Sequence, residues 1–159
     1  MLFRSRAILW AYVGLAAGDL LSGFLSQYLG TRKKVVLVFI LFSAASICTY
    51  MLTRGLSLGA FYALCTALGL GAGYWAVFVT MASEQFGTNI RATVTTTAPN
   101  FVRGAVPLIT LLFQSWRGSL GVIGSAAAVG AITIVVALIA LWNLEETHGK
   151  DLDYLEGMS

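Results

Sequence analysis

Charged side chains fall into a few short clusters, and this spacing constrains the fold of the chain more than any other feature. The 159 residues include ten basic and seven acidic ones. Most of these lie at positions 4–6, 32–34, 84–91 and 145–156. The intervals between the clusters offer room for membrane spans, since a helix needs roughly 20 apolar residues to cross a bilayer. The pattern excludes a water-soluble globular domain and a disordered chain.

The composition agrees with an integral membrane protein. Charged residues make up 11% of the chain and hydrophobic residues 58%, whereas soluble domains carry about 25% charge. The net charge is +3, but the basic residues form no patch of the kind that nucleic acids require. We therefore expect the lipid bilayer as a partner and no nucleic acid.

Five apolar segments predict an all-α, polytopic bundle of five transmembrane helices. A barrel is excluded because strands of alternating polarity are absent. The expected bundle occupies residues 1–143, and residues 144–159 form a tail in which 151–156 is expected to be a short surface helix or an extended strap. The expected spans are 7–29, 35–53, 58–82, 92–115 and 119–142.

The first apolar segment and the basic loops bear on topology. Arg4 and Arg6 precede an apolar stretch, as in a signal peptide, but Asp19 interrupts it and the apolar pattern continues to Leu29, which favours a span. The densest basic cluster, at 32–34, marks the cytoplasmic side. We expect a multi-pass protein of the plasma or inner cell membrane with a cytoplasmic C-terminus.

Two charged side chains lie near the middle of expected spans. Asp19 is close to the centre of the first span and Arg103 to the centre of the fourth. Each costs on the order of 3 kcal/mol on insertion scales, so intramembrane charge usually lies on a substrate or ion path. The alternative is a buried ion pair that only fixes helix packing.

Polar residues follow one face of the fourth span. Such a stripe faces protein or water rather than lipid. Pro99, Gly104 and Pro107 predict a kink or local unwinding beside Arg103, although a proline kink that only shapes packing is also possible. The stripe consists of Thr93, Thr96, Asn100, Arg103, Pro107, Thr110 and Gln114.

Small residues at a period of four predict helix packing seams. They are Gly14, Gly18, Ser22 and Ser26 in the first span and Gly69 and Gly73 in the third. Such residues allow two helices to approach closely. The third span also carries Tyr62 and Trp75, which we expect to line a cavity wall, because Trp75 lies too deep for the interfacial aromatic belt.

No catalytic or cofactor motif is found. His148 is the single histidine and has no metal-ligand partner nearby in the sequence. A nucleophile elbow and a phosphate-binding glycine loop are also missing. We expect no enzyme activity, metal or cofactor.

Three segments resemble cytoplasmic signatures of the major facilitator superfamily. Residues 23–34 resemble its Gly-x-x-x-Asp-Arg-x-Gly-Arg-Arg loop, with Gly23, Gly30 and the basic end Arg32-Lys33-Lys34 matching, and Gln27 and Tyr28 in place of the acid and the first arginine. Residues 84–92 are similar to Glu-x-x-Pro-x-x-x-Arg-Gly, with Glu84 and Arg91 matching. Residues 146–150 resemble the Glu-Thr-Lys-Gly-Lys tail of sugar-porter-like members.

This resemblance, over residues 13–156, implies helices eight to twelve of a twelve-helix transporter, with the missing N-terminal half as a partner. It implies a secondary active transporter that moves a small-molecule solute by alternating access, coupled to protons or another ion. The alternative is a transporter-derived structural or regulatory subunit that transports nothing. The expected pathway residues are Asp19, Tyr62, Trp75, Thr96, Asn100 and Arg103, and the expected gating-loop residues are Gly23, Gly30, Arg32, Lys33, Glu84 and Arg91.

Overall fold

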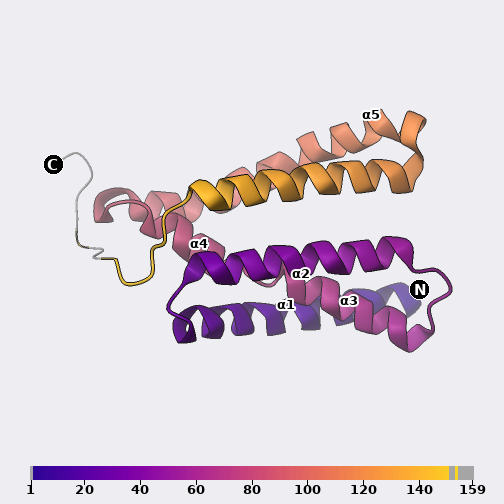
Figure 1. The fold of residues 1–159 in the computed structure, drawn as a ribbon, viewed down its shortest axis with the longest axis horizontal. Coiled ribbons are helices and arrows are strands. Elements are labelled where there is room, and N and C mark those ends of the chain that lie inside the picture. Colours follow the sequence, from indigo (N-terminus) through magenta and orange to yellow (C-terminus); the bar gives the residue numbers. More distant parts are fainter. Residues whose placement is uncertain (1, 151–152, 154–159) are drawn as a thin grey trace. The chain divides into compact units, whose positions relative to one another are not determined.

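The computed structural model describes residues 2–150 and 153, and its regular elements in that part of the chain are helices (Figure 1). The predicted all-α class is confirmed. The tail segment 151–156 lies outside the described residues except for Asp153. The elements are α1 (Leu2–Tyr28), α2 (Arg32–Leu52), α3 (Leu58–Ala72), α4 (Trp75–Glu84) and α5 (Thr88–Asn143).

Four helical stretches are long and apolar enough to cross a membrane: Ser5–Tyr28, Arg32–Leu52, Leu58–Glu84 and Thr88–Asn143. Large apolar side chains on them are exposed, for example Leu20 (78%), Leu52 (82%) and Trp142 (86%). Monomeric soluble proteins rarely expose extended apolar surface of this kind. The helices therefore have the surface of membrane-spanning segments.

Local signals define the first helix boundaries. Gly30 lies in the turn after the end of α1 and has a positive φ of 60°. Glycine adopts this conformation without steric cost. Thr31 then caps α2, because its side-chain oxygen accepts a hydrogen bond from the Lys34 backbone N–H at 3.4 Å. Ser57 caps α3 in the same way through the Ala60 N–H at 3.3 Å.

The third expected span is divided in the structure. α3 ends at Ala72 and α4 begins at Trp75, with Gly73 and Tyr74 between them outside any helix. An uninterrupted helix over 58–82 is therefore a wrong prediction. Gly73 has no Cβ atom and lies against α1, so close helix packing took precedence over continuous helix at this point.

The fourth and fifth expected spans both lie in α5. At 1.5 Å per residue its 56 residues would measure about 84 Å, well beyond a bilayer core of about 30 Å. Gly121 (φ 68°, ψ 177°) divides it into two helices. The loop expected at 116–118 is helical instead, so the turn lies a few residues later, at the glycine that can adopt this conformation.

Local unwinding beside Arg103 is also a wrong prediction. Gly121 is the residue of α5 with non-helical backbone angles, and the helix continues through Pro99 and Pro107. A proline removes one backbone hydrogen bond, yet the backbone angles around Pro99 and Pro107 stay helical.

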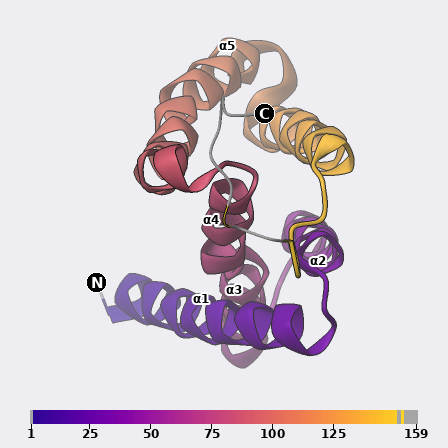
Figure 2. The ribbon, with the colours of Figure 1, turned by 90° about the vertical axis from the view of Figure 1, so that its left-hand side faces the viewer.

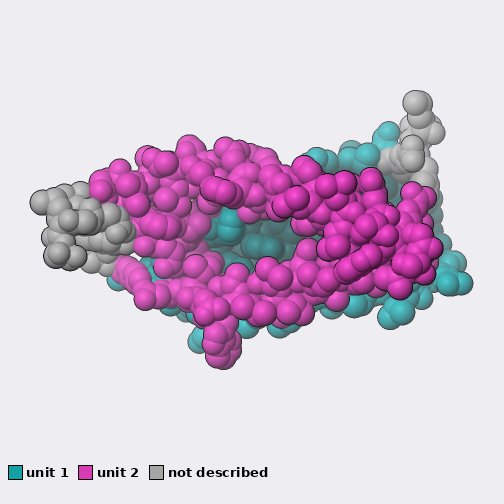
Figure 3. Space-filling model, turned by 90° about the horizontal axis from the view of Figure 1, so that it is seen from above, with its two compact units in different colours: residues 1–78, 146–149 teal, residues 79–145, 150–159 magenta. Residues whose placement is uncertain are grey.

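The chain divides into two compact units (Figure 3). Unit 1 comprises Met1–Phe78 with Glu146–Gly149, and unit 2 comprises Val79–Glu145 with Lys150–Ser159. Unit 1 therefore contains α1, α2, α3 and the first turn of α4, together with a short piece of the C-terminal segment. Unit 2 contains the rest of α4 and both halves of α5.

The interior of unit 1 is a small apolar core beside a glycine seam. The core residues Val35, Val36, Phe39 and Ile40 share one face of α2 and are at most 6% exposed. The Phe39 ring meets the Tyr74 ring edge-on, with centroids 6.3 Å apart. α1 runs across α3 (Figure 2). The small-residue packing seams predicted on each of these helices are confirmed, and the structure shows that they face each other.

Candidate functional site

The carboxylate of Asp19, which lies in a candidate membrane span, binds the start of α4. Its Oδ1 atom accepts hydrogen bonds from the backbone N–H of Trp75 at 3.0 Å and from that of Ala76 at 3.4 Å. The first N–H groups of a helix have no partner within the helix, and the positive end of the helix dipole favours an anion there. Asp19 therefore caps α4 from a different helix.

The break that Asp19 caps has its own backbone hydrogen bonds. The Gly73 N–H donates to the Leu70 oxygen and the Tyr74 N–H to the Ala72 oxygen, both at 3.0 Å. The regular helical pattern resumes where the Phe78 N–H donates to the Tyr74 oxygen at 2.9 Å. Non-helical backbone at membrane depth requires protein or water partners, and the side chain of Asp19 supplies them for Trp75.

Glycines bring Asp19 to this position. A Cβ atom on Gly18 would lie 2.9 Å from the Gly73 Cα, and one on Gly73 would lie 2.7 Å from the Asp19 backbone nitrogen. Any larger side chain would separate the two backbones. The seam that the sequence predicted as a packing device therefore also places the carboxylate against the break.

The two aromatic residues expected at a cavity wall lie on either side of the break. The Trp75 ring packs against Phe78, with centroids 5.6 Å apart, and is 38% exposed. Tyr62 is partly buried in α3, where its ring lies 5.9 Å from that of Phe61. Trp75 is thus brought to Asp19 through its backbone, whereas the hydrogen bonds and ring contacts described for Tyr62 do not involve that carboxylate.

The polar stripe of α5 forms a local chain of hydrogen bonds in unit 2. The Arg103 Nη1 donates to the Asn100 Oδ1 at 3.2 Å, and the Asn100 Nδ2 donates to the Thr96 oxygen at 3.0 Å. The Thr96 hydroxyl donates to the Thr93 oxygen at 2.9 Å. Three of the predicted pathway residues therefore share one helix face. Whether Arg103 meets Asp19 stays a prediction, because the two lie in different units.

An open, mainly apolar groove runs along the same part of α5. Its volume is about 620 Å³. Asn100 belongs both to its lining and to the hydrogen-bond chain of Arg103, so one wall of the groove carries a polar group. The lining residues are Thr97, Asn100, Phe101, Gly104, Ala105 and Leu108.

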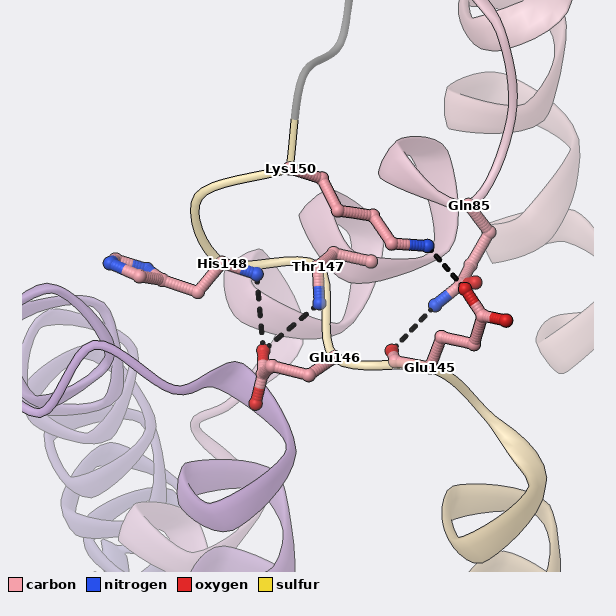
Figure 4. A network of polar contacts seen from close by, with 6 residues as sticks. All are labelled: Gln85, Glu145, Glu146, Thr147, His148 and Lys150. Atoms are coloured by element: carbon pink, nitrogen blue, oxygen red, sulfur yellow. Dashed lines mark hydrogen bonds and ion pairs between the residues drawn. The ribbon is translucent and has the colours of Figure 1, made fainter.

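A second polar site holds the carboxylate of Glu146 at the start of α2. Its Oε1 accepts from the Arg32 backbone N–H at 2.9 Å, and its Oε2 from the Lys33 N–H at 3.2 Å and from the Thr31 hydroxyl at 2.5 Å. The N–H groups of Thr147 and His148 donate to Oε1 at 3.0 and 3.2 Å (Figure 4). Five donors thus surround the Glu146 carboxylate. Three of them, in Thr31, Arg32 and Lys33, lie 113–115 positions before Glu146 in the sequence.

Sequence reasoning placed the two segments of this site in different motifs and missed their contact. The signal was present, since Thr31 is a preferred N-cap residue and the unpaired N–H groups at a helix start, next to three basic side chains, attract an anion. Glu146 was the acid of the tail motif. Gly30 lies beside the His148 ring, because a Cβ atom added to this glycine would be 3.6 Å from the ring.

The hydrogen bonds set the protonation state of Glu146. Partial burial on its own raises the pKa of this carboxyl, but the hydrogen bonds from Thr31, Arg32, His148 and Lys33 outweigh it and lower the pKa to about 2. Donors that stabilise the charged form have this effect. Glu146 is therefore ionised at neutral pH and acts as a fixed negative cap on α2.

The neighbouring part of the C-terminal segment makes separate contacts in unit 2 (Figure 4). Gln85 Nε2 donates to the Glu145 backbone oxygen at 2.8 Å, and Lys150 forms an ion pair with the Glu145 carboxylate. The hydrogen bond and charge of Lys150 lower the pKa of Glu145. This second carboxylate is exposed, so the two adjacent acids occupy different surroundings.

The other expected gating-loop residues are Arg91, Glu84 and Gly23. Arg91 Nη2 donates to the Phe86 backbone oxygen at 3.1 Å, which closes the loop before α5. Glu84 ends α4 and is buried. Gly23 has open space where a side chain would lie. Among the described residues, no group of three His, Cys, Asp or Glu side chains is placed to hold a metal ion.

Comparison with known proteins adds no family assignment. No protein-family profile, curated protein or solved structure matches this chain.

Proposed function

We propose that this chain forms part of a secondary active transporter that moves a small solute across the cell membrane by alternating access. The expected coupling is to protons or another ion, and the expected partner is the other half of such a transporter. The C-terminal segment is placed in the cytoplasm in this proposal.

The observation that carries the proposal is the contact of Glu146 with the start of α2. It joins the two segments whose motifs resemble cytoplasmic signatures of major facilitator transporters, at residues 31–33 and 146–148. The contact consists of hydrogen bonds to a single side chain that lies outside any helix, so it can form and break without rearrangement of the whole of α2. Alternating access needs contacts on one side of the membrane that hold one of two states.

Two further observations support transport. A carboxylate of a candidate membrane span lies at a helix break, and an arginine lies within an apolar helix beside a groove. Charges in such places usually mark substrate or ion paths. The transporter-derived, non-transporting subunit remains the competing function, and flux separates the two.

Arg103 provides the test. The complete gene product is reconstituted in proteoliposomes and assayed for uptake of glucose, benzoate and glycine betaine as a sugar, an anion and a zwitterion. We expect uptake of one of them in the wild type and its loss in Arg103→Gln, at near-normal expression, because the arginine binds an anionic group of the substrate or a coupling acid. Arg117→Gln is the matched control and should retain uptake.

The outcomes separate the alternatives. Uptake unchanged in Arg103→Gln would remove this residue from the mechanism. A collapse of expression in the variant would favour a buried ion pair with a packing role. Absence of flux for all three solutes in the wild type would favour the non-transporting subunit.

A further inference from the structure

We propose that Asp19 is a proton-binding site within the membrane, and that its charge controls the break between α3 and α4. Its link to solute movement rests on the proposed function above. The proposal names the coupling ion, H⁺, and the group that carries it. The proton adds to the carboxylate to give the neutral acid, and it leaves again as H⁺, with no other bond formed or broken.

The first step is that the negative charge of Asp19 is isolated from other acidic residues in the sequence. Asp19 is the only acid in the sequence before Glu84, and the apolar stretches after Arg91 contain none until Glu145. An uncompensated carboxylate in a span costs on the order of 3 kcal/mol on insertion scales. Two backbone N–H groups at a helix start compensate it here. The charged form is therefore stabilised by the break, and the break by the charged form.

The second step is what protonation changes. Hydrogen bonds to an ionised acceptor are roughly twice as strong as bonds between neutral groups. A proton on Asp19 removes the charge that faces the start of α4, and with it the favourable interaction with the helix dipole. The hydrogen bonds from the Trp75 and Ala76 N–H groups to this carboxyl are then weakened by about half, while the bonds of Gly73 and Tyr74 within the chain remain.

The third step concerns other groups that could titrate or interact with Asp19. The Ser22 hydroxyl donates to the Asp19 backbone oxygen at 3.1 Å and leaves the carboxylate unaffected. The charged residues of α2 lie in its first turn. The other charged residues of α1, Arg4 and Arg6, lie near its start. The remaining titratable side chains of α1, α2, α3 and the break are phenols and thiols: Tyr12, Tyr28, Cys48, Tyr50, Tyr62, Cys65 and Tyr74. Asp19 is thus the carboxylate that can exchange protons inside unit 1's spans.

The fourth step is that the break can transmit the change. α3 is fixed against α1, because a Cβ atom on Gly69 would lie 1.9 Å from the Ala11 oxygen. α4 is not bound by such a seam at its start, where Trp75 and Ala76 are exposed. The boundary between the two compact units falls after Phe78, one turn beyond the break. Asp19 therefore binds the segment through which the chain passes from one unit to the next.

The experiment measures the proton and the helix start directly, in the complete chain reconstituted in lipid nanodiscs. In a D151N/D153N background Asp19 is the only aspartate, so ¹³C-carboxyl aspartate gives it a unique infrared band. Spectra are taken from about pH 4 to about pH 9, a range that brackets large shifts of a carboxyl pKa. Hydrogen exchange at Trp75 and Ala76, corrected for intrinsic rates, is followed over the same range.

We expect the Asp19 band to change from carboxylate to acid as the pH falls, with exchange at Trp75 and Ala76 becoming on the order of tenfold faster. Asp19→Asn should abolish the band and make the corrected exchange independent of pH. Ser22→Ala, which leaves the carboxylate in place, should behave as wild type. If Asp19→Asn does not fold, the wild-type titration and Asp19→Glu, which keeps a titrating carboxyl, provide the same test.

The proposal would be overturned by an Asp19 band that does not titrate in this range, or by exchange that follows pH equally in Asp19→Asn. Neither readout requires flux. Absence of solute flux with a titrating Asp19 would therefore remove the proposed function and leave the proton site. Solute flux with a non-titrating Asp19 would do the reverse. With both present, Asp19→Asn should lose uphill accumulation and keep solute exchange.

Discussion

At the scale of single residues, two adjacent acids have different roles. Glu146 accepts five hydrogen bonds and closes the start of α2, whereas Glu145 is exposed and pairs with Lys150. Exposed ion pairs contribute little to stability, while a capping side chain contributes about 1 kcal/mol. The two positions therefore form a matched pair for mutation.

Glu146→Ala should destabilise the chain by about 1–2 kcal/mol, because the start of α2 loses its external cap. Glu145→Ala should change stability by less than about 0.5 kcal/mol. Denaturant titration of the purified chain in detergent micelles measures both, and hydrogen exchange at Arg32 and Lys33 localises the effect. Equal losses in the two variants would contradict the capping role.

The low pKa of Glu146 predicts the pH dependence of this contact. The folded pKa, about 2, lies below the ordinary value of 4.5, so the stabilisation is complete above the ordinary value and is lost as the pH falls through about 2. Protection of the Arg32 and Lys33 amides should follow this window. Glu145→Gln should leave the profile unchanged; loss of protection already near neutral pH would refute the prediction.

At the scale of helices, glycines determine where the backbone bends and prolines do not. The third span breaks at Gly73, where α1 leaves no room for a Cβ atom, and α5 turns at Gly121 with a positive φ. Pro99 and Pro107 remain within helical backbone. Packing between α1 and α3 therefore has more influence on this fold than proline geometry does.

The glycine seam predicts a sharp difference between two positions of α1. A Cβ atom on Gly14 would lie 2.1 Å from the Thr66 backbone oxygen, whereas one on Gly23 would meet nothing within 4 Å. Gly14→Ala should destabilise the chain by about 1–3 kcal/mol through forced separation of α1 and α3. Gly23→Ala should be neutral or stabilise by up to about 1 kcal/mol, since alanine favours helix. Thermal unfolding in detergent measures the stability of both variants. Equal changes in stability for Gly14→Ala and Gly23→Ala would contradict a packing role of the seam.

At the scale of the whole molecule, transport by alternating access depends on which side of the membrane each loop faces. The proposal requires the loop before α2, the loop before α5 and the C-terminal segment to lie on the cytoplasmic side. The contacts of Glu146 with α2 and of Gln85 with Glu145 each join the C-terminal segment to one of these loops. The first contact lies within unit 1 and the second within unit 2. Each can therefore be tested separately.

Cysteine labelling tests the sidedness. In a variant without the native Cys48 and Cys65, single cysteines at Lys34 and Thr88 should react with a membrane-impermeant maleimide from the same side, because both residues are exposed in loops or first turns. A cysteine at Arg54, in the loop after α2, should react from the opposite side. Labelling of positions 34 and 88 from different sides would refute the topology.

Charge spacing and apolar length were sufficient to predict the helical class, and the four-residue period of small residues was sufficient to predict the packing seams. These features depend on local chemistry, since a membrane helix must satisfy its backbone within itself. The break at Gly73 and the turn at Gly121 could not be located in this way, because glycines occur throughout the chain. Gly73 is distinguished by its contact with α1, whereas Gly121 is distinguished by its positive φ and a Cβ atom there would meet nothing within 4 Å.

The two carboxylate sites show the same division between local sequence and three-dimensional contacts. Asp19 and Glu146 stood out in the sequence as a charge within a span and as the acid of a tail motif. Their partners, at Trp75 and at Thr31, lie 56 and 115 residues away. Backbone N–H groups leave no trace in a sequence, since every residue but proline carries one. Which of them lacks a helical partner and faces a distant carboxylate was decided by the packing of α1 on α3 and by the path of the C-terminal segment across the start of α2.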